Sequence, residues 1–405
     1  MLPQPDPSHP SSVLIAGAGP AGARLASDLS RAGVPVTLVE TLSSADQQAF
    51  SSAALPMASA EALRIPERCW ATRWSGWQLM GPDGLQHQWW AGNPLGVVLD
   101  FAALRSQLWS EAEDAGVELL LNTRVELISL ESEAADVRLI AADGGIQQRR
   151  VRWLIDATGA RRALLRAAGV PVDSPEDPLL VGTGAEWLVQ CDDRSAAPWR
   201  DRLSFFLGSR WVHHGYAWIF PMDHCRLKIG VCRLPPRATS RRHGQGLGDA
   251  LKTLVRECGL ESCPVLDRHG GTVSSTVQRQ QSLGRGALIA IGDAAGTANL
   301  LGGEGIRHAL VSAACLAEAL MADPAKGPRL AYEDALRRRL GWRWPISGRL
   351  ARRTWSLDPD RSADQRMARL IDGLSRHATA EDLSALLFDY RFERYGIRLL
   401  PYLMR

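Results

Sequence analysis

The feature that most constrains the fold is a glycine-rich turn between a short apolar run and a helical stretch near the N-terminus. The apolar run, Val13 to Ala16, is typical of a buried parallel strand. It leads directly into Gly17-Ala18-Gly19-Pro20-Ala21-Gly22, which matches the pattern G-x-G-x-x-G. A helical stretch follows, and a second apolar run, Val36 to Val39, ends at Glu40. This order of strand, turn, helix, strand and acid predicts a Rossmann-type nucleotide-binding unit.

Each residue of the turn has a physical role in such a unit. Gly17 permits the tight change of direction, Gly19 lets a pyrophosphate approach the backbone, and Gly22 lets the helix pack closely on the strand. The helix begins near Pro20 and Ala21, so its free N–H groups and the positive end of its dipole face the pyrophosphate. We therefore expect these five residues to contact the nucleotide.

Glu40 defines the kind of nucleotide. It lies about 20 residues beyond the glycines, where a carboxylate accepts the ribose hydroxyls. An acid at this position disfavours a 2′-phosphate, so the site is not predicted to bind NADP. A second G-x-G-x-x-G unit is absent from the sequence, so any NADPH would bind only transiently.

Composition excludes several classes of protein. The 405 residues are 45% hydrophobic and 22% charged, as in ordinary globular proteins, and a net charge of +3 gives no argument for nucleic acid. The seven cysteines form no C-x-x-C pair and no zinc-like cluster, so we expect free thiols and no metal. The N-terminal segment lacks the form of a signal peptide, and no apolar run is long enough for a membrane span. We expect a cytoplasmic protein, with peripheral membrane contact left open and oligomeric state unpredicted.

Three further segments indicate a larger nucleotide-binding fold. Val151 to Gly159 is an apolar strand that ends in a small-residue turn. Ala287 to Gly296 is another apolar run, and it ends in Gly-Asp. Leu301 to Ile306 is a glycine-rich turn at the start of an alanine-rich helix that extends to Leu320. Such a turn presents N–H groups to an electron-rich ring edge.

These segments resemble the glutathione-reductase-type FAD enzymes of the hydroxylase branch, and within it the geranylgeranyl reductase family. The family's G-D-A-A-G and G-E-G-I stretches match Gly292 to Gly296 and Gly303 to Ile306. Its Y-x-W-x-F-P segment matches Tyr216 to Pro221, and the apolar strand with glycine that follows matches Ile229 to Val231. The resemblance covers about residues 12 to 320. Family members that reduce prenyl chains usually carry a Cys-Gly-Gly near the flavin, whereas Phe50 to Pro56 contains no cysteine here.

The resemblance implies that FAD is the cofactor and assigns contacts to it. Asp293 would bind the ribityl hydroxyls, Gly305 and Ile306 would lie at the pyrimidine edge, and Arg105 would replace a family arginine that is Phe101 here. Ala157 and Gly159 would lie by the ADP half, and Val125, in a strand expected from Leu119 to Val125, by the adenine. The complete set of cofactor-binding candidates is Gly17, Gly19, Pro20, Ala21, Gly22, Glu40, Arg105, Val125, Ala157, Gly159, Asp293, Gly303, Gly305 and Ile306.

The resemblance also implies an α/β fold with an α+β insertion. We expect a discontinuous Rossmann-type FAD-binding domain over 12–65, 96–170 and 282–322. Segments 66–95 and 171–281 would form an antiparallel-sheet substrate domain, and 323–405 a helical C-terminal cap. The strands expected in the substrate domain are Leu179 to Val189, Leu203 to Leu207, Ala217 to Pro221 and Arg226 to Arg233.

Aromatic residues suggest the nature of the substrate side. The sequence holds 14 tryptophans, and those in the two insertions suit either an aromatic pocket wall or a buried core. Trp218 and Tyr216, in the motif expected beside the flavin, are the candidates for the catalytic pocket. Glu304, at the start of the flavin-facing turn, is a third candidate, either as a proton relay or as a stabiliser of the helix N-terminus.

The leading functional hypothesis is reduction of carbon–carbon double bonds in a hydrophobic, isoprenoid-like small molecule or lipid. The cofactor would be FAD, reduced by NADPH or another transient electron donor. A flavin-dependent monooxygenase that hydroxylates an aromatic or polyene substrate is one alternative. A redox-neutral polyene cyclase or isomerase is another. A halogenase is disfavoured because the catalytic lysine of that family has no candidate in this chain, where the first lysine is Lys228. A flavin-binding protein without catalytic activity stays as the remaining alternative.

Overall fold

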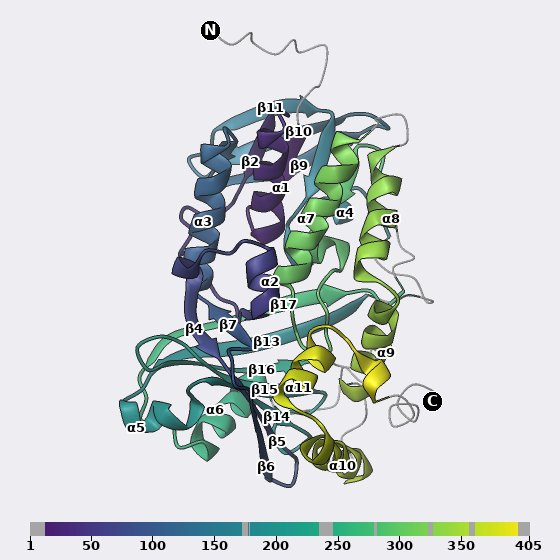
Figure 1. Cartoon of the computed structure of the whole chain (residues 1–405). Helices are drawn as coiled ribbons and strands as arrows, with labels where there is room; N and C mark the ends of the chain where they lie inside the picture. Colours follow the sequence, from purple (N-terminus) through teal and green to yellow (C-terminus); the bar gives the residue numbers. More distant parts are fainter. Residues whose placement is uncertain are drawn as a thin grey trace.

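The computed structural model describes residues 13–171, 177, 179–234, 246–278, 282–322, 327–355 and 361–395. The proline- and serine-rich N-terminal segment falls outside this range. Figure 1 shows an α/β part that carries α1, α3, α7 and α8, and a second part built on a large sheet with α5 and α6 on one side and α9 to α11 on the other. The expected combination of a Rossmann-type part, an antiparallel sheet and C-terminal helices is confirmed.

A six-stranded sheet forms the centre of the α/β part, in the order β18-β19-β12-β1-β2-β8. The strands from β19 to β8 are parallel, and β18 is antiparallel to β19. The first strand thus lies between two later ones, as in other Rossmann-type sheets. The strand bounds are β1 Val13–Ala16, β2 Val36–Val39, β8 Glu118–Leu120, β12 Trp153–Asp156, β18 Gly284–Arg285 and β19 Leu288–Ala290.

Helices pack on this sheet because their apolar faces match its buried strands. Leu25 and Leu29 of α1 are fully buried together with Leu14 of β1. The hydroxyl of Ser27 in α1 donates to the carbonyl of Glu111 in α3 at 3.2 Å, which joins the two helices. The helix bounds are α1 Pro20–Arg31, α2 Met57–Ala62, α3 Phe101–Asp114, α4 Ala163–Ala167, α7 Ile306–Met321 and α8 Pro328–Leu340. The alanine-rich helix expected to extend to Leu320 is α7.

One expected strand of this part is wrong. The run from Leu119 to Val125 is two strands, β8 and β9 (Thr123–Leu130), because Asn122 between them has a left-handed backbone with φ of 49°. β8 completes the parallel sheet, whereas β9 belongs to a three-stranded antiparallel sheet with β10 (Ala135–Ala141) and β11 (Ile146–Val151). Val125 therefore lies in the antiparallel sheet.

The second part is built on a seven-stranded sheet in the order β17-β13-β16-β15-β14-β5-β6. All neighbours are antiparallel except β14 and β5. The bounds are β5 Gly76–Met80, β6 Gln86–Trp90, β13 Leu180–Gln190, β14 Arg202–Leu207, β15 Gly215–Pro221, β16 Arg226–Arg233 and β17 Val265–Ser275. The four strands expected from the sequence are all present. β17 was not expected, because Asp267-Arg268-His269-Gly270-Gly271 interrupts its apolar pattern.

Short elements connect the two parts. A three-stranded sheet in the order β3-β7-β4 comprises Ala54–Pro56, Gly96–Leu99 and Trp70–Trp74. β4, from the predicted substrate segment, thus pairs with β7 of the predicted FAD segment. The domain limits expected from the sequence stay a prediction.

The C-terminal helices lie beside the large sheet in Figure 1. They are α9 Arg343–Trp355, α10 Arg361–His377 and α11 Ala380–Leu387, while α5 Asp193–Ala196 and α6 Leu247–Glu257 lie on its other side. The indole of Trp77 in β5 donates to the hydroxyl of Ser384 in α11 at 2.9 Å, which ties the cap to the sheet. Among the described residues, none of the helices has the length and apolar character needed to cross a membrane.

Candidate flavin site and substrate cavity

The glycine turn brings three backbone segments into direct contact. Gly17 has φ of +106°, and a Cβ on it would lie 2.4 Å from the carbonyl oxygen of Ala157. A Cβ on Gly22 would lie 1.9 Å from the carbonyl oxygen of Gly17. The main chain of Ala157 also donates to the carbonyl of Ala16 at 2.9 Å. Glycine at 17 and 22 is therefore required by the protein's own packing.

Gly19 is different because it faces open space. No heavy atom lies within 4 Å of the position that its Cβ would occupy. Gly19 is the N-cap of α1, Pro20 is its first residue and Ala21 follows, so unpaired N–H groups of the first turn lie beside this space. A backbone that is open at the start of a helix fits a pyrophosphate group.

The side chain of Glu40 is hydrogen-bonded to the glycine turn. Its carboxylate accepts hydrogen bonds from the backbone N–H groups of Ala18 at 2.8 Å and of Leu42 at 3.1 Å. Trp109 of α3 donates its indole N–H to the carbonyl of Ala18 at 2.7 Å. Glu40 therefore lies next to the glycine turn, as a ribose-binding acid must.

Arg105 holds the loop that follows Glu40. Its guanidinium donates to the carbonyls of Ala45 at 2.7 Å and of Gln47 at 2.5 Å, and its side chain is buried. In this structure Arg105 thus binds protein carbonyls, and its contact with the cofactor stays a prediction.

The remaining candidates of the ADP half are Gly159 and Val125. Gly159 has φ of +64° and no heavy atom near its Cβ position, so its backbone is open. Val125 lies half-buried in β9.

Asp156 was not recognised from the sequence. Its buried carboxylate accepts hydrogen bonds from the N–H groups of Leu164 and Leu165 at 2.9 Å and so holds the start of α4.

Asp293 lies at the other end of the site, in the turn after β19. Burial raises the pKa of its carboxyl to about 7, and a hydrogen bond from the backbone of Ser274 offsets part of this effect. Its Oδ1 lies 3.5 Å from the position of a Cβ on Gly305, the N-cap of α7, which begins at Ile306. A partly buried carboxyl group beside Gly305 suits the hydroxyls of a bound ribityl chain.

A cavity of about 260 Å³ lies next to this turn, and we call it the flavin-side cavity. Tyr216, Trp218 and Glu304, the three catalytic candidates, all line it, as do Gly303, Gly305 and Ile306. Gly303 has φ of +71°, and a Cβ on it would lie 2.1 Å from the hydroxyl of Tyr216. Sequence segments about 90 residues apart thus meet at one cavity, which a contiguous motif could not show.

Glu304 is held by three side chains. Its buried carboxylate contacts Arg307, the Nε2 of His308 at 3.2 Å, and the hydroxyl of Tyr390. Burial would raise its pKa, but the attraction of Arg307 and His308 outweighs burial and lowers the pKa to about 2. Glu304 is therefore ionised, which suits the stabilising interpretation better than the proton relay; its catalytic role stays a prediction.

A second charged group in the cavity wall was missed by the sequence reasoning. Glu186 of β13 is buried and accepts the indole N–H of Trp218 and the hydroxyl of Ser52, both at 2.8 Å. His269 of β17 lies 3.0 Å from the other carboxylate oxygen. A lone acid inside the apolar run from Leu179 to Val189 was the available signal for this site.

Trp218 is positioned by the strand next to its own. It pairs with Gly230 of β16, and a Cβ on Gly230 would lie 2.1 Å from the indole ring. The glycine that follows the aromatic motif thus makes room for the ring that lines the cavity.

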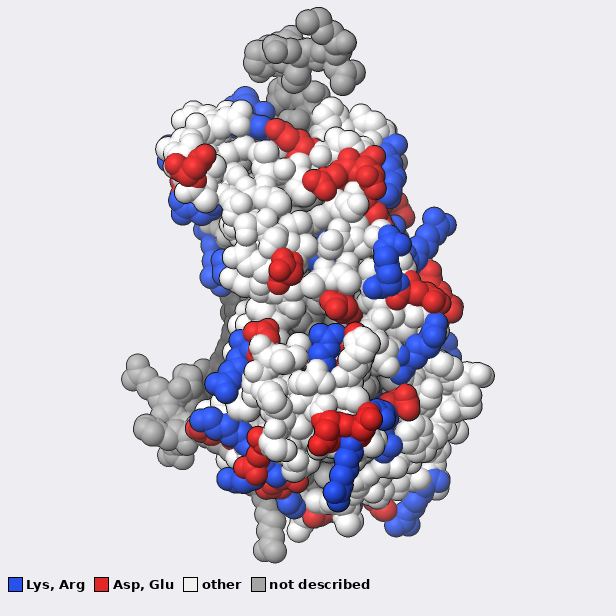
Figure 2. Space-filling model, turned by 90° about the vertical axis from the view of Figure 1, so that its left-hand side faces the viewer, with Lys and Arg blue, Asp and Glu red and all other residues white. Residues whose placement is uncertain are grey.

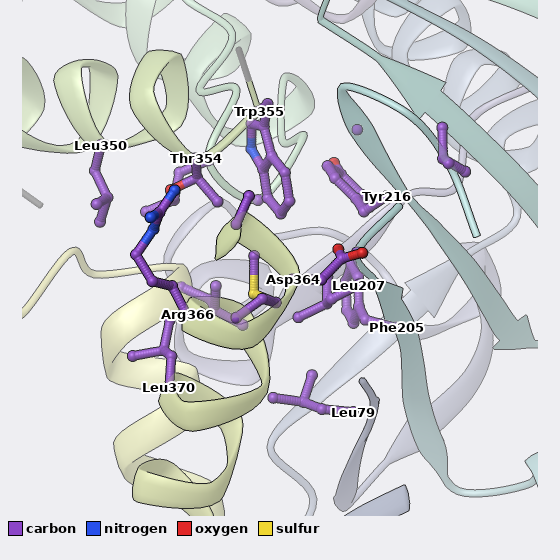
Figure 3. Close-up of a pocket in the computed structure, with 18 of the residues that line it drawn as sticks. Leu79, Phe205, Leu207, Tyr216, Leu350, Thr354, Trp355, Asp364, Arg366 and Leu370 are labelled. Carbon is purple, nitrogen blue, oxygen red and sulfur yellow. The ribbon is translucent and has the colours of Figure 1, made fainter. Parts of the chain in front are cut away.

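An apolar cavity of about 160 Å³ adjoins the first, and we call it the apolar cavity. Figure 3 shows its side chains converging from the sheet and from α9 and α10, among them Leu79, Leu350 and Leu370. Asp364 is at its edge, where both carboxylate oxygens accept from Ser209. The two cavities share the lining residues Phe205, Gly215, Tyr216, Gly302 and Trp355.

None of the five tryptophans of the first insertion lines either cavity. Trp74 and Trp77 are fully buried and pack edge to face with ring centres 5.0 Å apart, and Trp89 is buried as well. Trp90 is half exposed, with the guanidinium of Arg202 over its ring. The expected aromatic wall is thus formed by Trp218 and by Trp355, a C-terminal residue not singled out from the sequence.

The molecular surface gives no strong electrostatic field on the face seen in Figure 2, because acidic and basic side chains are interspersed there. Mixed charge of this kind does not steer highly charged ligands over long distances.

Comparison with known proteins agrees with this geometry. An FAD-binding-domain family model matches residues 10–64. The menaquinone reductase of Mycobacterium tuberculosis is 29% identical over 361 residues, which are 84% of this chain and 83% of that protein. The digeranylgeranylglycerophospholipid reductase of Methanothrix thermoacetophila is 24% identical over 350 residues, 84% of this chain and 85% of that protein.

A solved structure shows the same fold over nearly the whole chain. The geranylgeranyl bacteriochlorophyll reductase-like protein of Thermoplasma acidophilum superposes with a TM-score of 0.79 at 20% identity, covering 97% of this chain and 99% of the other. The open backbone at Gly19, the acid Glu40 and the partly buried Asp293 fit the pyrophosphate, ribose and ribityl groups of FAD. When bound and reduced, FAD supplies a hydride. The chain is an FAD-dependent oxidoreductase that is similar to the geranylgeranyl reductase-like proteins.

Proposed function

We propose that the enzyme reduces a carbon–carbon double bond in a hydrophobic, isoprenoid-like substrate. The observation that carries this proposal is the junction of the flavin-side cavity with the apolar cavity at Tyr216 and Trp355. A long apolar chain that spans the junction would have one double bond near the cofactor and its remainder among aliphatic side chains. Relatives named as reductases of menaquinone and of digeranylgeranylglycerophospholipid support a lipid of this class.

The walls of the junction suit a reduction that excludes water. The indole N–H of Trp355 donates to the carbonyl of Leu300 at 3.1 Å, and its ring centre lies 5.0 Å from that of Tyr216. Burial raises the pKa of the Tyr216 hydroxyl well above its ordinary value, so the hydroxyl stays protonated. Tyr216 and Trp355 thus present neutral, rigid rings to the substrate, as an apolar chain requires.

The enzyme needs a source of electrons, and we propose NADPH or another reduced carrier that binds transiently. The proposal is tested by reducing the FAD-loaded protein without oxygen and then adding either a prenyl lipid or air. Fast flavin reoxidation by the lipid and slow reoxidation by air support the reductase. No reoxidation by any prenyl lipid, together with fast oxygen consumption that depends on an aromatic compound, would favour a monooxygenase.

A further inference from the structure

A chain of hydrogen bonds runs through the wall of the flavin-side cavity. Its centre is the carboxylate of Glu186, whose side chain is 5% exposed. One oxygen accepts from the Ser52 hydroxyl and the Trp218 indole, and the other lies 3.0 Å from Nε2 of His269. Ser52, Glu186 and His269 all line the cavity.

His269 connects this centre to solvent. It lies opposite Glu186 in the register of β13 and β17, and its ring stacks on Phe50 with centres 4.4 Å apart. Its second nitrogen, Nδ1, lies 3.1 Å from the carboxylate of Asp267, whose side chain is 57% exposed. A continuous path of polar atoms therefore leads from the surface to Ser52.

Neighbouring charged groups favour the ionised form of Glu186 and the hydrogen bonds of His269. Both ring nitrogens of His269 face carboxylates, and only the doubly protonated ring donates to both. Arg233 and Glu304 also line the cavity. Lys228 of β16 is a buried cation that acts on Glu186, and its ammonium donates to the carbonyls of Ser51 at 2.6 Å and Leu99 at 3.2 Å. Burial would raise the pKa of Glu186, but His269 and Lys228 outweigh it and lower that pKa. Glu186 thus rests as an ionised acceptor next to a proton donor.

We propose that Asp267, His269, Glu186 and Ser52 form a proton path that supplies the substrate in the flavin-side cavity. This inference rests on the proposed reduction, which breaks one π bond and forms two C–H bonds, one with a hydride and one with a proton. His269 gives its Nε2 proton to the ionised Glu186, and Glu186 passes a proton to Ser52 as Ser52 gives its hydroxyl proton to the substrate carbon. The His269 ring then regains a proton from water through Asp267. One solvent proton enters for each double bond reduced.

Three substitutions test the path. His269→Gln keeps a hydrogen-bonding group near Glu186, but its amide cannot act as an acid or a base. Glu186→Gln removes the ionised acceptor, and Ser52→Ala removes the terminal donor without touching the buried charges. We expect each to slow lipid-dependent flavin reoxidation at saturating lipid by about 10²–10⁴-fold. FAD content should be unchanged, and the solvent deuterium isotope effect should rise because proton transfer becomes limiting. His377→Gln, an exposed histidine at the end of α10, is the matched control and should behave as the unaltered protein does.

A second readout needs no turnover. In protein with ¹⁵N-labelled histidine and no substrate, the resonance that is lost in His269→Gln should show both ring nitrogens in hydrogen bonds. In Glu186→Gln the same resonance should shift, because Nε2 loses its carboxylate partner. An unshifted resonance in Glu186→Gln, or a His269→Gln variant that reoxidises as fast as His377→Gln, would overturn the proton path. If no prenyl lipid reoxidises the unaltered enzyme, the proposed substrate class fails instead, and the ring signal still decides whether the charged path exists.

Discussion

The nucleotide end of the site consists mainly of main-chain groups, whereas the substrate end consists of side chains. At the nucleotide end, the predicted contacts are main-chain groups of one contiguous turn, and Gly17 and Gly19 matter because they lack side chains. At the substrate end, side chains make the surface, and Glu186, Trp218 and His269 come from three strands of one sheet. The comparison teaches that a backbone site is local in sequence, whereas a side-chain site depends on which strands become neighbours.

The largest change in stability should follow from removing the charge of Glu304, which contacts Arg307 and His308 at the substrate end. Glu304→Gln leaves Arg307 buried without its carboxylate, and we expect a loss of about 3–5 kcal/mol in the free energy of unfolding at pH 7. Because the folded pKa of Glu304 is about 2, below its ordinary 4.5, the carboxylate stabilises the fold above pH 4.5 and this contribution is lost as pH falls towards 2.

Thermal melting of both proteins across this pH range measures that loss. The gap in melting temperature between the unaltered protein and Glu304→Gln should narrow as pH falls. Glu61→Gln, an exposed residue of α2, should show little gap at any pH. A constant gap for Glu304→Gln would show that its charge does not stabilise the turn.

At the nucleotide end, Gly17→Ala should destabilise the protein itself. Its φ of +106° and the 2.4 Å approach to Ala157 predict strain and overpacking that cost about 2–4 kcal/mol. The melting temperature of the flavin-free protein measures this cost. An unchanged melting temperature would mean that the contact with Ala157 relaxes easily.

Gly19→Ala should separate binding from folding. The added Cβ would meet no protein atom, so the melting temperature of the flavin-free protein should not change. The FAD affinity should fall about 10–100-fold, or ~1.4–2.7 kcal/mol, because the methyl group occupies the space for the pyrophosphate. Fluorescence titration with FAD gives the affinity. Equal losses for Gly17→Ala and Gly19→Ala in both measurements would remove the distinction between a structural and a binding glycine.

The smallest effect is expected in the apolar cavity. Leu370, labelled in Figure 3, lines the apolar cavity, so Leu370→Trp should fill part of it. The KM for a long prenyl lipid should then rise about tenfold, which corresponds to a loss of ~1.4 kcal/mol in binding. A short-chain analogue should be less affected. Leu330→Trp, an exposed position on α8, is the control, and an equal KM change at both positions would argue against a chain in this cavity.

Much of the fold was predictable because its determinants are periodic or local. The apolar strands β1, β2 and β16, the turn at Gly17 and the helix after Gly305 all carry contiguous signals. β17 and the break at Asn122 were missed, because one strand lacks an apolar pattern and the other feature depends on a single backbone angle.

The site was predictable only in part. The motif residues Tyr216 and Trp218 do meet Gly303 and Glu304 in one cavity, although their chemical roles await experiment. The partner of Glu186 was hidden, because His269 lies 83 residues away and reaches it only through the pairing of β13 with β17. Long-range strand pairing leaves no local trace in the sequence, so side chains that it brings together emerge only from the structure.

The central claim is that the enzyme adds hydrogen across a carbon–carbon double bond. The most direct measurement is mass spectrometry of a prenyl lipid after single turnover with the anaerobically reduced protein in deuterated water. The account predicts a product that has gained two hydrogen atoms for each flavin oxidised, at least one of them deuterium from the solvent. A product that forms only with air and gains oxygen, or an isomer of unchanged composition, would contradict it.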